Sequence, residues 1–238
     1  ISRKNYKKEQ YYILRRYRPA DLYGLLEVRP HIMLMNYNDF NGFKETGFDH
    51  YDIHWEFKNG YRIDTGMNHT TQGVKEAFNI VDDVTIQPGT YNHKEAQIVF
   101  HTDKSAPLSF SIRNYIGGRF GGDRKSIEPV VTYRYGENFT SEFSVKHNNY
   151  DLPVGNFVNN LTKMRLSYSF NPRMLLQALV QYNSGDDTLS TNLRFSWLQT
   201  ATSGLYVIYN EFDDSSIGAL PKGKEFSIKY SYMFDALK

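Results

Sequence analysis

The chain has 238 residues, a formal net charge of +2 and no cysteine, which is enough length for one large all-β domain. The absence of cysteine excludes disulfides, thiolate metal sites and cysteine nucleophiles. The small net charge argues against a nucleic-acid partner, as do aromatic residues that follow strand period rather than basic clusters. The mean hydropathy is −0.58, and no apolar run approaches the roughly 20 residues of a membrane-spanning helix, which leaves a β-barrel as the remaining kind of membrane protein.

Residues 1–22 differ from the rest of the chain because they are strongly basic. They contain two acids, Glu9 and Asp21, against seven bases: Arg3, Lys4, Lys7, Lys8, Arg15, Arg16 and Arg18. We expect a solvated lead-in to the first strand, with contact to lipid headgroups or to an acidic partner as the alternative. No similar change in composition follows, so the sequence predicts one further domain over 23–238.

From residue 23 onward, apolar and polar residues alternate in segments that are separated by turn residues, which is typical of β-strands with one apolar and one polar face. The pattern predicts about 12 strands, most of about 9–12 residues. Their central parts are 25–37, 51–58, 61–67, 96–100, 110–116, 131–135, 139–145, 161–170, 174–182, 189–197, 205–212 and 226–234.

The connections between these segments carry their own signals. Pro30 predicts a sheet edge, a bulge or a strand end, and Asn59-Gly60 predicts a two-residue hairpin turn. Residues 70–90 break the alternation, so we expect a short helical turn or a loop over Val74–Ile80 and a turn at Pro88-Gly89. We also expect a flexible loop at the glycine cluster Gly117–Gly122, which lacks the spacing of a phosphate-binding loop, and a longer connection at 147–156.

The alternation alone does not decide whether the apolar face contacts lipid or a second sheet. The predicted strands are close to the 9–11 residues that span a membrane, whereas strands of soluble proteins more often have about 5–6 residues. Many aromatic residues lie near the predicted strand ends, as in the aromatic girdles of membrane barrels. We therefore predict an antiparallel transmembrane β-barrel in the outer membrane of a Gram-negative bacterium, with its polar face toward the interior.

No catalytic motif is present in the sequence. There is no Gly-x-Ser-x-Gly elbow and no His-Glu-x-x-His motif. His50 and His54 share one strand face, where we expect them to line the interior rather than bind a metal. Residues 213–216 are polar and acidic but lack an EF-hand pattern. We therefore expect no enzyme activity, no cofactor and no metal site.

Charged residues on the polar faces are the candidate binding residues. Acids come early in the chain and bases later, and the two sets are Asp52, Glu56 and Asp64, and Arg113, Arg134, Arg165, Arg194 and Lys229. In a closed barrel these sets would face each other and create a field that orients polar solutes in a channel. In the alternative interpretation the charges pair with one another or with a plug and seal the interior.

Three runs in the second half of the chain carry a family resemblance: residues 164–184, 191–195 and 204–210. Together with the turn at 86–91 and the glycine cluster at 118–123, they resemble the C-terminal outer-membrane barrel region of Bacteroidota-type proteins that carry an N-terminal family 9 carbohydrate-binding-like domain. The resemblance covers roughly residues 50–238 and implies the C-terminal portion of a longer polypeptide. It supplies no catalytic residues.

These observations leave three functional hypotheses. In the first, an outer-membrane barrel in contact with outer-membrane lipids acts as a membrane anchor or channel linked to carbohydrate recognition or envelope transport. In the second, the barrel is a structural subunit that contacts other envelope proteins through residues 1–22, 36–48 and 213–223. In the third, the chain is a soluble β-rich domain that binds or cleaves glycans.

Overall fold

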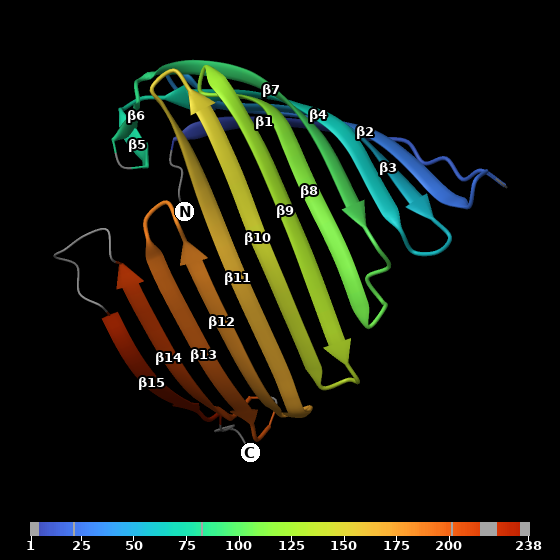
Figure 1. Ribbon diagram of the computed structural model, residues 1–238, viewed down its shortest axis with the longest axis vertical. Helices are drawn as coiled ribbons and strands as arrows, with labels where there is room; N and C mark the ends of the chain where they lie inside the picture. The colour runs from blue at the N-terminus through green and yellow to red at the C-terminus, as the bar shows by residue number, and fades with distance from the viewer. Residues whose placement is uncertain (1–4, 21, 82, 201, 215–222, 234–238) are drawn as a thin grey trace. The chain divides into compact units, whose positions relative to one another are not determined.

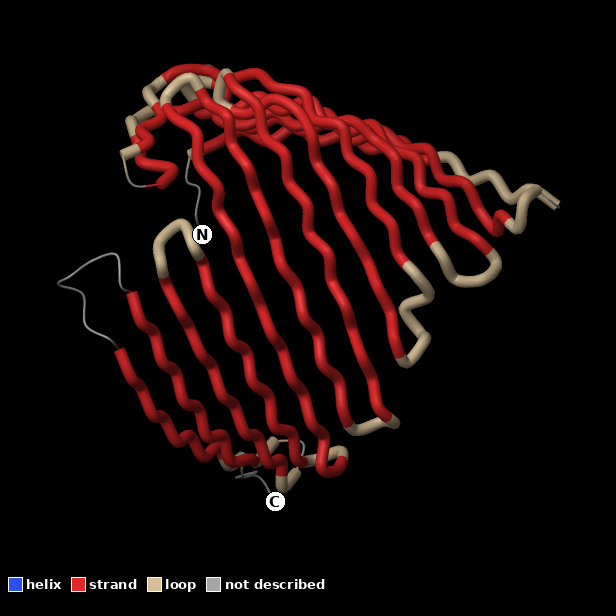
Figure 2. Tube along the Cα trace, in the orientation of Figure 1, coloured by secondary structure: helices blue, strands red, loops and turns tan. Residues whose placement is uncertain are grey.

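The computed structural model describes residues 5–20, 22–81, 83–200, 202–214 and 223–233. In these ranges every regular element is a β-strand (Figure 2), and no helix in this part of the chain has the length and apolar character to cross a membrane. The strands are β1 (Tyr6–Leu14), β2 (Leu25–Asp39), β3 (Lys44–Phe57), β4 (Arg62–Val74), β5 (Phe78–Val81), β6 (Val84–Ile86), β7 (Gly89–His101), β8 (Leu108–Arg119), β9 (Gly122–Tyr135), β10 (Phe139–Leu152), β11 (Gly155–Asn171), β12 (Met174–Asn183), β13 (Thr188–Leu198), β14 (Gly204–Asp214) and β15 (Gly223–Ser231).

Thirteen strands form one sheet in the order β1-β2-β3-β4-β7-β8-β9-β10-β11-β12-β13-β14-β15, and β5 pairs with β6 in a separate small sheet (Figure 1). Neighbouring strands run antiparallel. The predicted all-β antiparallel fold is therefore confirmed. β1 and β15 end the strand order, so closure into a barrel stays a prediction.

The chain divides into two compact units, which are described separately. The first unit contains Ile1–Ser105, Phe110–Pro129 and His147–Asn159, and the second contains Ala106–Ser109, Val130–Lys146 and Asn160–Lys238. The long strands β8 to β11 contribute residues to both units. The functional site described below lies entirely in the first unit.

The described residues contain fifteen strands instead of about 12, and the three additional ones are β1, β5 and β6. The sequence predicts residues 1–22 to be a solvated lead-in to the first strand. All residues of β1 are exposed, but β1 is itself a strand that pairs with β2 along its whole length. The expectation of a helical turn or loop over Val74–Ile80 is met only at residues 75–77, which connect β4 to β5, because β5 begins at Phe78 and forms a hairpin with β6. The segment predicted as the first strand is therefore the second, β2.

Three predicted loops are shorter than expected because the flanking strands continue into them. The glycine cluster 117–122 is strand except for Phe120 and Gly121, whose φ angles of 46° and 84° make a tight left-handed turn. Only residues 153–154 separate β10 from β11, and only residues 40–43 separate β2 from β3. The proposed contact loop 36–48 is thus mostly strand. Residues 215–222 of the other proposed contact loop lie outside the described residues.

The structure locates both local sequence signals, the proline and the Asn-Gly turn. Pro30 lies inside β2, one residue beyond the point where the continuous pairing with β1 ends at His31, which suits a residue without an N–H donor. The Asn59-Gly60 signal marks the β3–β4 hairpin, although the loop there has three residues, because the Phe57 amide donates to the Tyr61 carbonyl. Gly60 has a φ of 83°, which favours glycine.

The apolar core of the first unit is small and lies where the β5–β6 hairpin packs. Its buried members are Val74, Val84, Ile86, Phe120 and Leu152. The Phe120 ring lies edge-on to the rings of Phe78 and Tyr91, with centroids 5.9 and 5.4 Å away. Strands of three and four residues are too short to be stable alone, so this cluster is what holds the hairpin in place.

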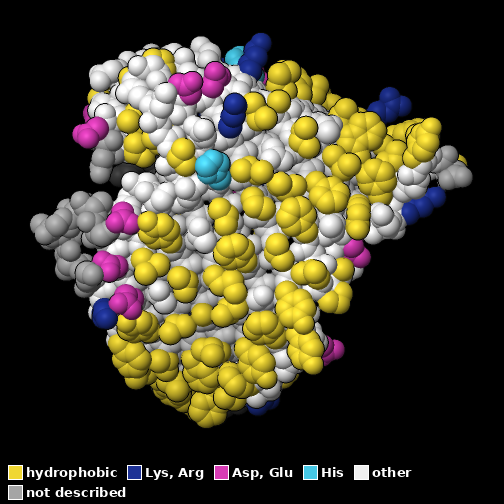
Figure 3. Space-filling model, in the orientation of Figure 1, with side chains coloured by type: hydrophobic (Ala, Val, Ile, Leu, Met, Phe, Trp, Pro, Cys, Tyr) yellow, Lys and Arg dark blue, Asp and Glu magenta, His cyan; other side chains and the backbone are white. Residues whose placement is uncertain are grey.

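Along the main sheet, apolar side chains are exposed and polar side chains are buried. In the first unit, one cross-strand row joins Ile32, Tyr51, Met67, Ala96 and Ile116, and its large members are 39–59% exposed. The next row, on the other face, contains His31, Asp52 and Gln97, all of which are buried. Figure 3 shows hydrophobic side chains covering much of the face in view, with few charged ones among them.

The second unit shows the same separation of faces. One row runs through Leu166, Ala178, Leu193, Tyr209 and Phe226 from β11 to β15. The adjacent row on the opposite face runs through Arg165, Leu179, Asn192, Asn210 and Glu225. Residues opposite each other in register share a face, so the apolar and polar faces predicted over residues 161–197 are confirmed.

Candidate functional site: a histidine–aspartate cluster on the polar face

Strand β3 places three functional side chains on the polar face of the first unit. His50, Asp52 and His54 are two residues apart, so the pleat directs all three to the same face. Asp52 lies opposite His31 of β2 and opposite Gly66 of β4. Because Gly66 has no side chain, the Asp52 carboxylate can lie against its backbone, where a Cβ would be only 2.8 Å from Asp52 Oδ1.

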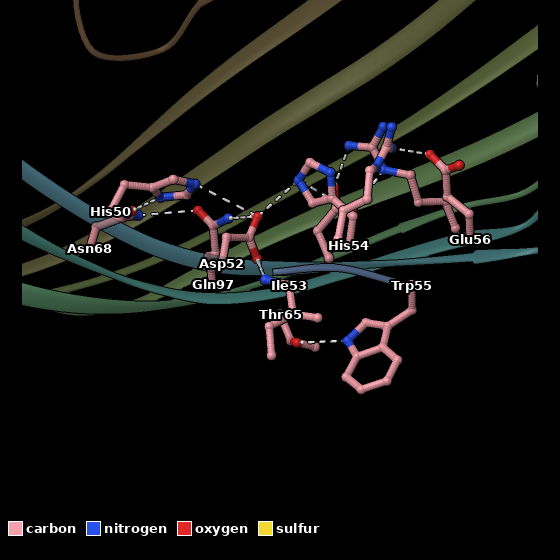
Figure 4. Close-up of polar contacts among 12 residues, drawn as sticks. His50, Asp52, Ile53, His54, Trp55, Glu56, Thr65, Asn68 and Gln97 are labelled. Atoms are coloured by element: carbon pink, nitrogen blue, oxygen red, sulfur yellow. Dashed lines mark hydrogen bonds and ion pairs between the residues drawn. The ribbon is translucent and has the colours of Figure 1, made fainter. Parts of the chain in front are cut away.

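The imidazoles gather around one carboxylate. His54 Nε2 is 3.1 Å and His50 Nε2 is 3.7 Å from Asp52 Oδ2, on either side of it (Figure 4). The His31 ring packs against both histidines, with ring centroids 5.0 Å from His50 and 4.8 Å from His54. Asp52 and His31 are only 5% and 9% exposed. A buried carboxylate is thus surrounded by three aromatic nitrogen bases.

A chain of hydrogen bonds holds this arrangement from the side of β4 and β7. His50 Nδ1 is 2.5 Å from Asn68 Oδ1. Asn68 Nδ2 donates to Gln97 Oε1 at 3.1 Å, and Gln97 Nε2 donates to Asp52 Oδ2 at 3.2 Å. Because an amide oxygen only accepts, Nδ1 of His50 is the protonated nitrogen, and Nε2 of a neutral His50 presents a lone pair toward Asp52.

Ion pairs surround the cluster. Arg62 binds Asp64 in a bidentate manner, with nitrogen–oxygen distances of 2.7 and 2.6 Å, and Arg124 lies 2.6 Å from Glu95. These pairs line one cavity of about 530 Å³ together with His50, Asp52 and His54. The same cavity is lined by Arg113 and Arg119 of β8. It therefore offers hydrogen-bond donors, carboxylates and imidazoles within one polar space.

The structure places the candidate acids of the sequence analysis in this region. Asp52 and Asp64 are buried and line the cavity, and Arg113 lines it from β8 while pairing with Glu128 at 3.5 Å. Glu56 does not line it and forms an ion pair with Arg29 instead. Three of the eight candidate residues are thus brought together.

The remaining four candidate bases belong to the second unit and do not line this cavity. Arg134 donates to the carbonyl oxygen of Ala106 at 3.4 Å. The Arg194 guanidinium lies 5.6 Å from the centroid of the Tyr206 ring, and Lys229 is opposite Tyr206 in register. Arg165 lies on the polar face of β11, opposite Leu179. Their role in binding stays a prediction.

Several members of the site are not predicted from the sequence. His31, Asn68, Glu95, Gln97, Arg119 and Arg124 come from five strands and meet only through strand register. One signal was available, since His-x-Asp-x-His over residues 50–54 places three possible ligands on one strand face. The described residues contain two groups with ligand atoms within 4.8 Å of one another: His31, His50 and Asp52, and Asp52, His54 and Asp64.

Lys75, which directly follows β4, links the end of this strand to the β2–β3 connection. Its ammonium group lies 2.7 Å from Glu45 and 2.9 Å from Asp39, at the β2–β3 connection. The hydrogen bond to Glu45, followed by that to Asp39, raises the pKa of Lys75. Lys75 therefore stays charged at neutral pH and attaches the end of β4 to this turn.

We expect Gly66→Ala to lower the free energy of unfolding by about 1–3 kcal/mol. A Cβ at residue 66 would lie 2.6 Å from the Tyr51 carbonyl oxygen and 2.8 Å from Asp52 Oδ1, so the backbone or the carboxylate must move. The denaturant midpoint of the purified protein in detergent measures the change. Gly47→Ala is the matched control, because its Cβ would mainly meet the flexible end of Lys44. Equal shifts for the two variants would contradict this role of Gly66.

Comparison of the chain with models of known protein families, with curated proteins and with solved structures gives no match. The family resemblance carried by residues 164–184, 191–195 and 204–210 therefore rests on those motifs alone. Function has to be inferred from the two faces of the sheet and from the cluster around Asp52.

Proposed function

We propose that this chain forms part of the wall of an outer-membrane β-barrel that acts as a membrane anchor or channel. The observation that carries the proposal is the reversed burial of the sheet. Among the described residues, fourteen polar or charged side chains are buried, against seven hydrophobic ones. A water-soluble sandwich buries its apolar faces against each other, whereas a membrane barrel turns its apolar face to lipid and its polar face inward.

Strand length and aromatic position support the same proposal. The strands of the main sheet have 9 to 17 residues, which reaches or exceeds the roughly 9–11 residues that a tilted membrane strand needs. Tyr135, at the end of β9, is 71% exposed, and Trp197, near the end of β13, is 40% exposed. Aromatic side chains at the ends of spanning strands are typical of the membrane–water interface.

The polar face bears on the choice between anchor and channel. In the first unit, Glu56 pairs with Arg29 and Asp64 pairs with Arg62, which supports the interpretation that interior charges neutralise each other locally. The cavity beside them supports contact with a polar solute. The family resemblance adds the proposal of a link to carbohydrate recognition or envelope transport, with outer-membrane lipids, other envelope proteins and glycans as partners. We assign no catalytic step to the chain.

Reconstitution into phospholipid vesicles tests the proposal. We expect the purified chain to fold in detergent or vesicles, to remain with the membrane after an alkaline carbonate wash, and to migrate differently on a gel with and without heating. A chain that folds as a monodisperse species in buffer without detergent would contradict the proposal and favour the soluble glycan-binding domain. Ion current across a planar bilayer would then assign a channel, and insertion without current would assign an anchor.

A further inference from the structure

We propose that the first unit binds one divalent first-row transition-metal ion through His31, His50 and Asp52. Two imidazoles and one carboxylate are a ligand set that such ions use, with further coordination positions left for water or a bound molecule. This inference goes beyond the barrel proposal and does not depend on it, since it rests on side-chain geometry within one unit. It also differs from the sequence-based expectation that these histidines only line the interior.

The first argument is the direction of the lone pairs. The hydrogen bond of His50 Nδ1 to Asn68 Oδ1 leaves Nε2 of the neutral ring as an acceptor. This Nε2 faces Asp52 Oδ2, another acceptor, at 3.7 Å. Two acceptors at that distance lack a donor between them, but an ion with metal–ligand distances of about 2.0–2.2 Å can bind both.

The second argument is the state of His31. It is 9% exposed, and its Nδ1 has no hydrogen-bond partner among the described residues. A ring nitrogen of His31 lies within 4.8 Å of the ligand atoms of His50 and Asp52. A buried polar atom without a partner destabilises the fold. A coordinate bond from the His31 ring to the ion would complete the set of three ligands.

The neighbouring group of Asp52, His54 and Asp64 is a weaker candidate. Asp64 forms a bidentate ion pair with Arg62, so the charge of this carboxylate is already balanced by a cation. Asp52, in contrast, accepts from the neutral Gln97 amide and the Ile53 backbone N–H. His54 is close enough to Asp52, at 3.1 Å, to act as a donor to it. We therefore assign His54 to orienting the Asp52 carboxylate, together with Gln97 at 3.2 Å.

The surroundings meet the other requirements of a metal site. Asn68 and Gln97 form the outer hydrogen bonds that orient metal-binding side chains. His50 and Asp52 line the cavity of about 530 Å³, which gives the ion a path of entry and room for water ligands. The ligands come from strands rather than loops, so their positions are set by the β2–β3 register.

Metal titration of the full chain in detergent, after treatment with EDTA, tests this inference. With Co²⁺ as the spectroscopic probe and Zn²⁺ as the competitor, we expect one ion per chain, visible Co²⁺ absorption bands, and no competition from Mg²⁺, which prefers oxygen ligands. Asn68→Ala should weaken binding by about 10- to 100-fold. His50→Ala should cause a larger loss, and the Co²⁺ bands should disappear.

Two matched variants keep the result interpretable. His69 lies on the opposite face, 3.5 Å from Asp49 of β3, so His69→Ala removes a histidine beside an aspartate without touching the site and should leave binding unchanged. Asp64→Asn should also leave the stoichiometry at one ion. No binding by the unaltered chain, or equal loss in His50→Ala and His69→Ala, would overturn the proposal. Loss in Asp64→Asn together with binding in His50→Ala would overturn the assignment of ligands.

Discussion

Replacing Leu193 with arginine should cost about 2–4 kcal/mol of folding free energy in a lipid membrane. Leu193 lies at the middle of β13 (Thr188–Leu198), is 40% exposed, and faces the same side as its neighbours Ala178 and Tyr209. If this face contacts hydrocarbon, the arginine side chain has to enter the apolar layer. On a face in contact with water, the same substitution would change stability by no more than about 0.5 kcal/mol.

The measurement is the urea dependence of folding into phospholipid vesicles, followed by tryptophan fluorescence. Tyr135→Arg is the control for depth, because Tyr135 ends β9 and is 71% exposed. At a membrane interface its cost should be only about 0–1 kcal/mol. A small and equal effect of both substitutions would contradict lipid contact along the apolar face.

Much of the main sheet can be predicted from the sequence because period 2 follows directly from the pleat of a strand. Each of the twelve predicted segments overlaps a strand of the main sheet, although 226–234 extends beyond the end of β15 at Ser231 and its last residue lies outside the described residues. The predicted faces are correct where the strand register defines them. β1 is not predicted because its sequence shows no alternation: four consecutive residues are apolar, namely Tyr11, Tyr12, Ile13 and Leu14. β5 and β6 are not predicted because strands of four and three residues are too short to show an alternation of apolar and polar residues.

The candidate site was predictable only where its residues share one strand. His50, Asp52 and His54 are visible as neighbours on a face, and Asp64 follows on the next strand of the hairpin. The position of His31 beside Asp52 depends on the β2–β3 register. That register includes a shift between Leu25 and Glu27, and no local residue pattern specifies it. The same holds for Gln97, which reaches Asp52 from β7 across β4.

Phe120→Ala should lower the free energy of local unfolding of the β5–β6 hairpin from the first unit by about 3–5 kcal/mol. Phe120 is 4% exposed and contacts Phe78 of the hairpin and Tyr91 of β7 through ring edges. Alanine would leave a cavity among the buried members of the apolar core. The substitution would not relieve backbone strain at residue 120, because a φ of 46° is unfavourable for any residue with a Cβ.

Amide hydrogen exchange measures this effect at single residues. In Phe120→Ala, we expect the amides of residues 78–86 to exchange faster while those in the centres of β3 and β4 keep their protection, because the hairpin pairs only with itself. Phe226→Ala is the control, since Phe226 is 65% exposed and lies in the second unit. Unchanged protection of the hairpin in Phe120→Ala would mean that the cluster around this ring is not what holds it. Faster exchange throughout β3 and β4 would mean that Phe120 supports the first unit as a whole, and that the hairpin, although paired separately, unfolds with the main sheet.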